Sequence, residues 1–445
     1  MNSLVNITPQ RLLLALSLAL TFGLSCCFAQ DITALGGELS NSIPGHNGIQ
    51  VAAPNVTDTG RRATQLLGFE TFHRNFKKSE GLGPNFINDA CGGCHIQNGK
   101  GPVRLRGARL KMNTMVIKVA LEGSGENGAP INVPGVGEQL QDRTNSPRLK
   151  SRFRVRLRWR FISGKFPDGE RYRLRQPRRL RFRIPGYSRK EIKSSLRMTP
   201  AIIGPGLLES IPEATILGWS DPDDTNNDGI SGRPSYIPDK VNSGLTLGRF
   251  GLRAAQPTVE QQSAAAAFFD MGISNRLFDG GEDTPNLSDE GLEKLTVYQE
   301  IAGVPFARNQ ENERVVAGKV LFQQIGCDDC HKMTVTTESS SSPELDGQTI
   351  HPFTDLLLHD MGAGLADNRP EFSASSSEWR TLPLWGLGFI RTVSRVELRF
   401  MHDGRARSVQ EAILWHGGEA QASRDAFKNL SKRERTSLLR FLDSL

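Results

Sequence analysis

Two copies of a Cys-x-x-Cys-His motif constrain this chain more than any other feature. The motifs supply four cysteines and two histidines: Cys91, Cys94, His95, Cys327, Cys330 and His331. Two thiols three positions apart can bond the two vinyl groups at one edge of a porphyrin, and the adjacent histidine can bind the iron. A four-cysteine zinc site or a pair of redox dithiols would use the same thiols. Because a histidine follows both pairs, the spacing favours two covalently bound haem c groups.

The other cysteines lie in an N-terminal apolar segment. The chain has 445 residues and six cysteines, and Cys26 and Cys27 fall in Leu12–Phe28, which carries no charge. This pattern predicts a signal peptide over residues 1–29, cleaved after Ala29. An uncleaved anchor helix and a lipoprotein are the alternatives. Because no second apolar run of about 20 residues follows, we expect an exported, periplasmic protein without a membrane span, whose remaining cysteines all belong to the two motifs.

An arginine-rich segment alternates with period two. From Arg152 to Phe161 every second residue is arginine, Asp168-Gly169 is a typical hairpin turn, and Arg171–Arg175 resumes the alternation. The pattern predicts a β-hairpin with one arginine face and one apolar face, within an insertion at residues 150–185.

This hairpin accounts for the basic net charge of the chain. Residues 152–183 hold 12 arginines, Lys165, Asp168 and Glu170, a net charge of 13 − 2 = +11, whereas the whole chain has +7. The rest is therefore mildly acidic. The hairpin is interpreted as a docking face for an anionic partner such as an electron-transfer protein, or as a solvated face near haem propionates. We expect no nucleic-acid partner for an exported protein.

Helical patterns precede or follow the second motif. They cover residues 258–278, 311–326 and 409–445, and Ser431 with Glu434 has the form of a capping box. We predict a mainly α fold of two cytochrome c-like haem domains. Residues 30–62 are a linker arm, residues 63–300 the first haem domain with the β-hairpin insertion, and residues 301–445 the second.

Several segments carry a resemblance to known families. Pro383–Gly388 and His402–Ala406 resemble the C-terminal signature of bacterial di-haem cytochrome c peroxidases. From about Ala63 the chain resembles the related di-haem oxidoreductase family, whose members are also described as thiol oxidoreductases or peroxidases. The other resembling segments are Gly81–Phe86, Cys91–His95, Gly206–Pro212, Asp221–Pro234, Asp270–Ile273, Thr354–Gly362 and Glu411–Glu419.

The resemblance implies a function. We expect a peroxidase-like oxidoreductase that receives electrons from a small redox protein or another donor. Electrons would enter at the C-terminal haem and pass to an open N-terminal haem, where peroxide or a related small oxidant is reduced. A di-haem electron carrier with both irons closed is one alternative. An oxidase acting on a protein or thiol is another, although the haem motifs leave no cysteine for thiol exchange.

The resemblance also implies a sixth ligand for the second haem. In the peroxidases this ligand lies thirteen positions after the aspartate that corresponds to Asp403, which gives His416 here. Those enzymes mostly carry methionine there, and histidine should lower the potential. His359 is the second candidate. The iron bound by His95 is expected to be open; the candidates that could close it are Met112, Met115 and His73.

Carboxylates supply two further candidate sites. Glu209, with Glu213 as the second choice, lies in the segment that resembles the distal region of the peroxidases and could move a proton there; a structural role is the alternative. Asp224, Asn226 and Asp228, followed by glycine, match the start of a calcium loop. The twelfth loop position is serine instead of glutamate, so an Asp/Asn-rich turn without calcium is the alternative.

Overall fold

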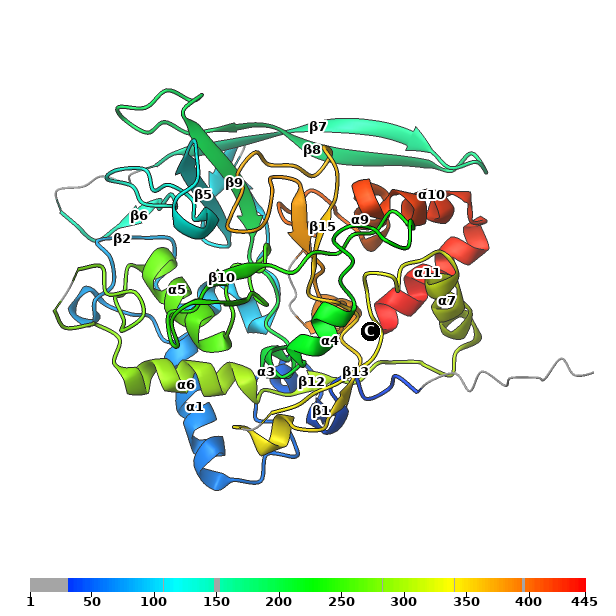
Figure 1. Cartoon of the computed structure of the whole chain (residues 1–445), viewed down its shortest axis with the longest axis horizontal. Coiled ribbons are helices and arrows are strands. Elements are labelled where there is room, and N and C mark those ends of the chain that lie inside the picture. The colour runs from blue at the N-terminus through cyan, green and yellow to red at the C-terminus, as the bar shows by residue number, and fades with distance from the viewer. Residues whose placement is uncertain (1–30, 107, 148–152, 282, 340, 394–396) are drawn as a thin grey trace, which may run out of the picture. The chain divides into compact units, whose positions relative to one another are not determined.

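The computed structural model describes residues 31–106, 108–147, 153–281, 283–339, 341–393 and 397–445. The chain divides into residues 1–32 and residues 33–445, and the elements below belong to the second unit (Figure 1). The predicted signal peptide, residues 1–29, lies outside the described residues. No helix within the described ranges is long and apolar enough to cross a membrane.

The prediction of a mainly α fold is wrong. Helices hold 31% of the residues and strands hold 19%, and the strands form several small sheets. The chain carries 45 glycines and 24 prolines, and both residue types interrupt helices. Three helices, α2 to α4, are accordingly only four, five and six residues long. The division into haem domains at 63–300 and 301–445 stays a prediction.

The described helices and strands alternate along the chain. The helices are α1 (Thr59–His73), α2 (Cys91–Cys94), α3 (Pro205–Glu209), α4 (Glu213–Gly218), α5 (Val259–Met271), α6 (Asp289–Glu300), α7 (Glu313–Gln324), α8 (Leu387–Val393), α9 (Val409–Trp415), α10 (Gln421–Asn429) and α11 (Lys432–Ser444). The longer strands are β5 (Met115–Leu121), β7 (Val155–Lys165), β8 (Arg171–Arg181) and β9 (Ile192–Met198). The short strands are β1 (Ser40–Asn41), β2 (Asn85–Phe86), β3 (Arg104–Arg106), β4 (Arg109–Lys111), β6 (Arg143–Thr144), β10 (Tyr236–Pro238), β11 (Leu245–Leu247), β12 (Val304–Pro305), β13 (Val335–Thr336), β14 (Thr349–Ile350), β15 (Leu358–Asp360) and β16 (Glu378–Arg380).

The predicted β-hairpin is confirmed. β7 pairs with β8 in antiparallel register from Arg156 opposite Arg181 to Lys165 opposite Arg171. The turn contains Gly169 at a φ of 89°, a conformation that glycine adopts without strain. Figure 1 shows the hairpin as a long two-stranded ribbon. The alternating pattern was sufficient to predict it because alternate residues of β7, Val155 and Leu157, are buried at the base of the hairpin.

A sheet core lies beneath the base of this ribbon. β7 and β8 extend a four-stranded sheet in the order β3-β4-β7-β8, and β5 pairs with β9. Val155 and Leu157 of β7 are buried in one cluster with Met115 and Ile117 of β5 and Leu196 of β9. The sequence did not predict β5 and β9, because their pairing joins segments about 75 residues apart.

Two helix pairs form the helical part of the structure. α1 packs on α6 and α7 packs on α11. Gly68 on α1 lies against the backbone of Lys294, and Gly318 on α7 lies against the backbone of Ser437, so each pair approaches too closely for a side chain at that point. The predicted capping box of Ser431 and Glu434 at the start of α11 is confirmed. The first helix of each pair, α1 or α7, precedes one Cys-x-x-Cys-His motif in the sequence.

Candidate functional site

The two motifs have equivalent surroundings. The ring centre of Phe72, on α1, lies 6.1 Å from that of His95 at an interplanar angle of 53°. The ring centre of Phe322, on α7, lies 6.3 Å from that of His331, also at 53°. In both cases the phenylalanine comes from the helix that precedes the motif. The same arrangement of a helix phenylalanine beside a motif histidine therefore occurs at both motifs.

In both motif histidines Nδ1 forms a hydrogen bond to a backbone carbonyl, and Nε2 has no hydrogen-bond partner among the described residues. His95 Nδ1 lies 3.0 Å from the carbonyl oxygen of Pro200, and His331 Nδ1 lies 2.9 Å from that of Phe353. Since a carbonyl oxygen can only accept, Nδ1 carries the proton and Nε2 keeps its lone pair. Burial lowers the pKa of both imidazoles to about 4. Each ring is thus a neutral imidazole, oriented as metal-binding histidines are.

The four cysteines of the motifs are half-buried and form no disulfide. Burial raises the pKa of Cys91 and of Cys327 to about 12, so neither is a reactive thiolate at neutral pH. The glycines between Cys91 and Cys94 have a packing reason: a Cβ on Gly92 would lie 2.7 Å from the His73 ring, and one on Gly93 would lie 2.6 Å from Asn88.

A cavity of about 220 Å³ adjoins the second motif. Its walls are mainly apolar, and its charged side chains are cationic: Lys100, Arg380 and Arg424. The described lining contains no carboxylate. A haem has an apolar ring, two negatively charged propionates and an iron that binds imidazole. An apolar wall with cations and imidazoles therefore fits haem.

His416 lines the same cavity as His331. It follows α9, and its Nδ1 lies 2.8 Å from the carbonyl oxygen of Ala412. This leaves Nε2 with its lone pair, as in the two motif histidines. Burial lowers the pKa of His416, so its ring is neutral at pH 7. The structure thus brings together the two imidazoles that the resemblance had assigned to one iron.

His359 also lines this cavity, but both of its nitrogens are occupied. Nε2 lies 2.8 Å from Asp355 Oδ2, and Nδ1 lies 2.6 Å from Glu419 Oε2. The two carboxylates hold the pKa of His359 well above its usual value despite its burial. The ring is therefore an imidazolium that donates to both carboxylates and has no lone pair to offer a metal.

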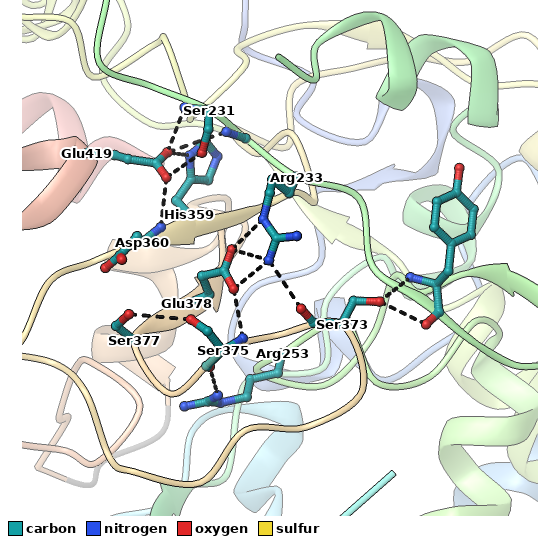
Figure 2. Close-up of polar contacts among 12 residues, drawn as sticks. Ser231, Arg233, Arg253, His359, Asp360, Ser373, Ser375, Ser377, Glu378 and Glu419 are labelled. Carbon is teal, nitrogen blue, oxygen red and sulfur yellow. Dashed lines mark hydrogen bonds and ion pairs between the residues drawn. The ribbon is translucent and has the colours of Figure 1, made fainter. Parts of the chain in front are cut away.

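Glu419 joins three segments that carry the family resemblance (Figure 2). Its carboxylate accepts from the Ser231 hydroxyl at 2.7 Å, from the Asp360 backbone N–H at 2.9 Å and from His359. Asp355 and Glu419 were not singled out individually in the sequence. Their signal was their position inside the resembling segments, where a buried carboxylate needs a partner.

Another histidine of the cavity wall stacks on a tryptophan. The ring centres of His402 and Trp379 lie 3.7 Å apart at an angle of 5°. Burial lowers the pKa of His402 to about 4. The Trp379 indole also donates from Nε1 to the Leu365 carbonyl at 3.1 Å. This aromatic pair therefore has a fixed orientation in the wall.

The three residues predicted as possible sixth ligands of the iron at the first motif make contacts elsewhere in the structure. Met112 and Met115 are fully buried in the sheet core. His73 Nδ1 lies 2.8 Å from the Phe69 carbonyl, and its Nε2 lies 3.0 Å from Gln50 Nε2. His73 packs against Gly92, so it supports the motif from outside. The assignment of a sixth ligand to this iron stays open.

The two candidate catalytic carboxylates differ in their surroundings. Glu209 Oε2 accepts from the backbone N–H of Val259 at 2.6 Å, at the start of α5. Burial raises the pKa of Glu209, which would suit a proton donor. Glu213 is exposed in the first turn of α4. Glu209 therefore has a structural contact in addition to its predicted role, and neither role excludes the other.

The candidate calcium loop is a tight, exposed turn. Asp224 Oδ1 accepts from the Gly229 N–H at 3.1 Å, and Asn226 Oδ1 accepts from the Asp228 N–H at 2.9 Å. Gly229 has a φ of 83°, as the sixth position of such a loop requires. The shape agrees with the sequence pattern, and calcium binding stays a prediction.

Comparison with known proteins extends these observations. The model of a family described as "Di-haem oxidoreductase, putative peroxidase" matches residues 185–284 and 279–445, which together exceed half of the chain. No curated protein matches the sequence. Among solved structures, hydrazine synthase from Kuenenia stuttgartiensis, pressurised with 20 bar of xenon, shares 14% identity over 86% of this chain and 92% of that chain, with a TM-score of 0.35.

Proposed function

This chain belongs to the di-haem oxidoreductase family, and from that premise we propose that it is an exported c-type cytochrome with peroxidase-like activity. Electrons enter at the site formed by Cys327–His331 and reach an oxidant at the site formed by Cys91–His95. The oxidant is peroxide or a related small molecule. A haem c at each motif supplies one-electron redox chemistry and an iron that can bind axial ligands.

The residues of each motif attach and orient the group. Each thiol would add its sulfur and hydrogen across one vinyl double bond, giving a thioether with no oxidant consumed. His95 and His331 would hold the iron through Nε2, because the carbonyls of Pro200 and Phe353 engage Nδ1 of each ring. The apolar lining of the cavity excludes water, which retains the electron-transfer site in a low dielectric.

The second site is proposed to be closed by two imidazoles. His331 and His416 line one cavity, and Ala412 orients the second ring. Lys100 and Arg380 are the cations placed to pair with the propionates, since burial lowers the pKa of Lys100 to about 8 and it would gain from a negative partner. A closed site of this kind transfers electrons without binding substrate.

The first site is proposed to be where the oxidant binds. Glu209, with a pKa raised by burial, is the predicted proton donor there. Glu213 is the second choice, and its side chain is exposed. The described hydrogen bond of Glu209 uses Oε2, and a proton would be delivered from the other oxygen, Oε1.

The observation that carries the proposal is that three imidazoles share one hydrogen-bonding pattern: His95, His331 and His416 each donate from Nδ1 to a backbone carbonyl and keep Nε2 free.

The test is absorption and resonance spectroscopy of the purified holoprotein, with the haem content measured as the pyridine haemochrome. We expect two haems per chain, one lost in Cys91→Ser/Cys94→Ser and one in Cys327→Ser/Cys330→Ser.

The spectra also test the assignment of the two sites. We expect one low-spin and one high-spin haem, and His416→Ala should convert the low-spin signal to high-spin. Peroxide should oxidise the reduced wild-type protein and be consumed catalytically with a reductant present. Two low-spin haems in every redox state, with no peroxide turnover, would instead identify an electron carrier.

A further inference from the structure

One face of the sheet formed by β4, β7 and β8 carries a concentrated positive charge. Residues that face each other across paired strands lie on the same side of the sheet. The register therefore aligns Arg109, Arg156 and Arg181 across three strands and sets Arg158 opposite Arg179. Together with Arg160 these exposed side chains form what we call the arginine face: Arg109, Arg156, Arg158, Arg160, Arg179 and Arg181.

The arginine face is not neutralised by the rest of the protein. In the described part of the chain, none of its six side chains takes part in an ion pair, and Arg160 donates to the neutral amide of Gln176 at 2.7 Å. Like charges directly opposite each other destabilise a strand pair. An arrangement that costs stability in the free protein is expected at sites that serve a function.

The two acidic residues of the hairpin form ion pairs with an arginine outside the hairpin. Arg435 on α11 pairs with Asp168 Oδ2 at 2.6 Å and with Glu170 Oε2 at 2.8 Å. Phe166, next to the turn, packs on Phe427 of α10 with ring centres 6.2 Å apart. The turn is thus anchored on the C-terminal helices, and its carboxylates cannot cancel the arginines at the base of the hairpin.

The hairpin also contacts the segment that follows His402, a residue of the cavity wall beside the second motif. Arg175 donates from Nη2 to the Gly404 carbonyl at 2.8 Å and from Nε to the Arg405 carbonyl at 3.0 Å. This segment follows directly after His402, which lines the cavity. Arg175 lies opposite Phe161, the residue after Arg160. Because successive strand residues point to opposite faces, Arg175 contacts this segment from the side of the sheet opposite the arginine face. The arginine face is therefore separated from this segment by the thickness of the hairpin.

We propose that the arginine face is the docking surface for an acidic electron-donor protein, which it holds beside the second haem site. This inference rests on the proposed function for the direction of electron flow. Opposite charges on two proteins raise the rate of encounter and orient the complex. An anionic membrane is the other occupant that the test distinguishes, since Phe161 and Ile162, which follow Arg160 on β7, are exposed apolar side chains of the kind that surface-bound elements insert among lipids.

The test compares three forms of the holoprotein. Arg156→Gln/Arg158→Gln/Arg179→Gln removes three charges from the arginine face. A matched control, Lys78→Gln/Arg314→Gln/Arg440→Gln, removes three exposed charges away from the arginine face. None of these three side chains has an ion pair in the described part of the chain. Binding of an oxidised, acidic monohaem c-type cytochrome is measured by calorimetry at low and at physiological salt, with a basic cytochrome as the second probe. Stopped-flow absorbance then follows reduction by the acidic cytochrome.

We expect wild type and the control to bind the acidic cytochrome alike and to lose affinity as salt rises. The arginine variant should bind at least about tenfold more weakly at low salt, with a flatter salt dependence and a similarly slower reduction. Equal binding by all three forms would overturn the proposal. So would a variant that loses binding to phosphatidylglycerol vesicles while keeping its affinity for the cytochrome.

The experiment distinguishes a failure of the docking-surface proposal from a failure of the proposed function. Calorimetry requires no electron transfer, so it reports on the arginine face even if the haem assignment is wrong. If the cytochrome binds but does not reduce the protein, while a small neutral reductant also fails, the proposed direction of electron flow is wrong and the docking surface stands. Retained folding of the arginine variant is checked by its circular dichroism.

Discussion

The Nδ1 atom of His416 lies 2.8 Å from the carbonyl oxygen of Ala412, one helical turn earlier in the chain. The bond uses a carbonyl that becomes free where α9 ends, since the last carbonyls of a helix have no partner within it. The orientation of His416 is therefore set locally, by the end of a short helix. A residue at this position can change the ligand without moving the backbone.

Replacing His416 with methionine should keep the second iron six-coordinate and raise its potential. Thioether ligation favours the reduced iron relative to imidazole. We expect a rise on the order of 100 mV, a fraction of the roughly 0.8 V that axial ligands span. Potentiometric titration of the low-spin signal measures it. An unchanged potential in His416→Met would show that His416 is not a ligand.

Removing the charge of Glu419 should destabilise the protein. Glu419→Gln leaves the His359 imidazolium with one carboxylate and weakens the contacts to Ser231 and Asp360. Breaking a buried ion pair costs about 3 kcal/mol or more. Urea unfolding should show this loss, whereas Glu122→Gln, which removes an exposed pair with Lys193, should change stability by less than about 1 kcal/mol. A similar effect of both changes would contradict the assignment.

The same pair should give stability a defined pH window. The pKa of Glu419 is lowered to about 2 by its contact with His359, so its contribution is complete above about pH 4.5 and is lost as the pH falls toward 2. The pKa of His359 is raised, so its contribution is complete below about pH 6.5 and is lost as the pH rises through its value in the folded state.

The pair therefore stabilises most between about pH 4.5 and 6.5. We expect the loss of stability in Glu419→Gln to be greatest there, at about 3 kcal/mol. Unfolding midpoints measured across the pH range in wild type and Glu419→Gln give the contribution as a difference. A difference that does not shrink toward pH 2 would contradict the link between the carboxylate and its lowered pKa.

A methyl group at Gly92 should disturb the first motif. Its Cβ would lie 2.7 Å from the His73 ring, and overpacking of this kind costs about 1–3 kcal/mol. We expect Gly92→Ala to lower the thermal midpoint and the haem content at the first motif. Gly218→Ala has open space around its Cβ and serves as the control. Equal midpoints for the two variants would show that the motif tolerates the shift.

Calcium should bind at the Asp224 turn if the loop pattern has its predicted meaning. Elemental analysis after treatment with a chelator and return of calcium should give one ion per chain in wild type. Asp224→Asn/Asp228→Asn should give none, because the variant removes the two carboxylates of the loop. No bound calcium in the wild type would identify the segment as a turn stabilised by its own hydrogen bonds.

The sequence predicted local structure better than architecture. The hairpin, α5, α7 and the capping box of α11 follow from periodicity and short-range hydrogen bonds, and the structure contains each of them. Strands that pair over long separations have no such signal. Ser40, for example, pairs with Val304, and nothing in either segment specifies the other. The mainly α prediction failed at strands of this kind.

The sequence proposed the residues of the candidate site but not their geometry. The motifs supplied the proposed attachment points, and the family resemblance supplied His416 as a predicted ligand. Which nitrogen each imidazole leaves free depends on the carbonyls of Pro200 and Phe353, which lie far from the motifs or have no recognisable pattern. The pairing of His359 with Glu419, 60 residues later, likewise arises from the folded arrangement alone.

The two carboxylates around His359 have a consequence for the maturation of the protein. His359 lines the cavity that His331 and His416 share, and a neutral imidazole there could capture iron in the wrong geometry. Because Asp355 and Glu419 each take one of its N–H groups, the ring has no lone pair for a metal. If His331 and His416 hold the second iron as proposed, this placement of protons prevents His359 from competing with them for the metal.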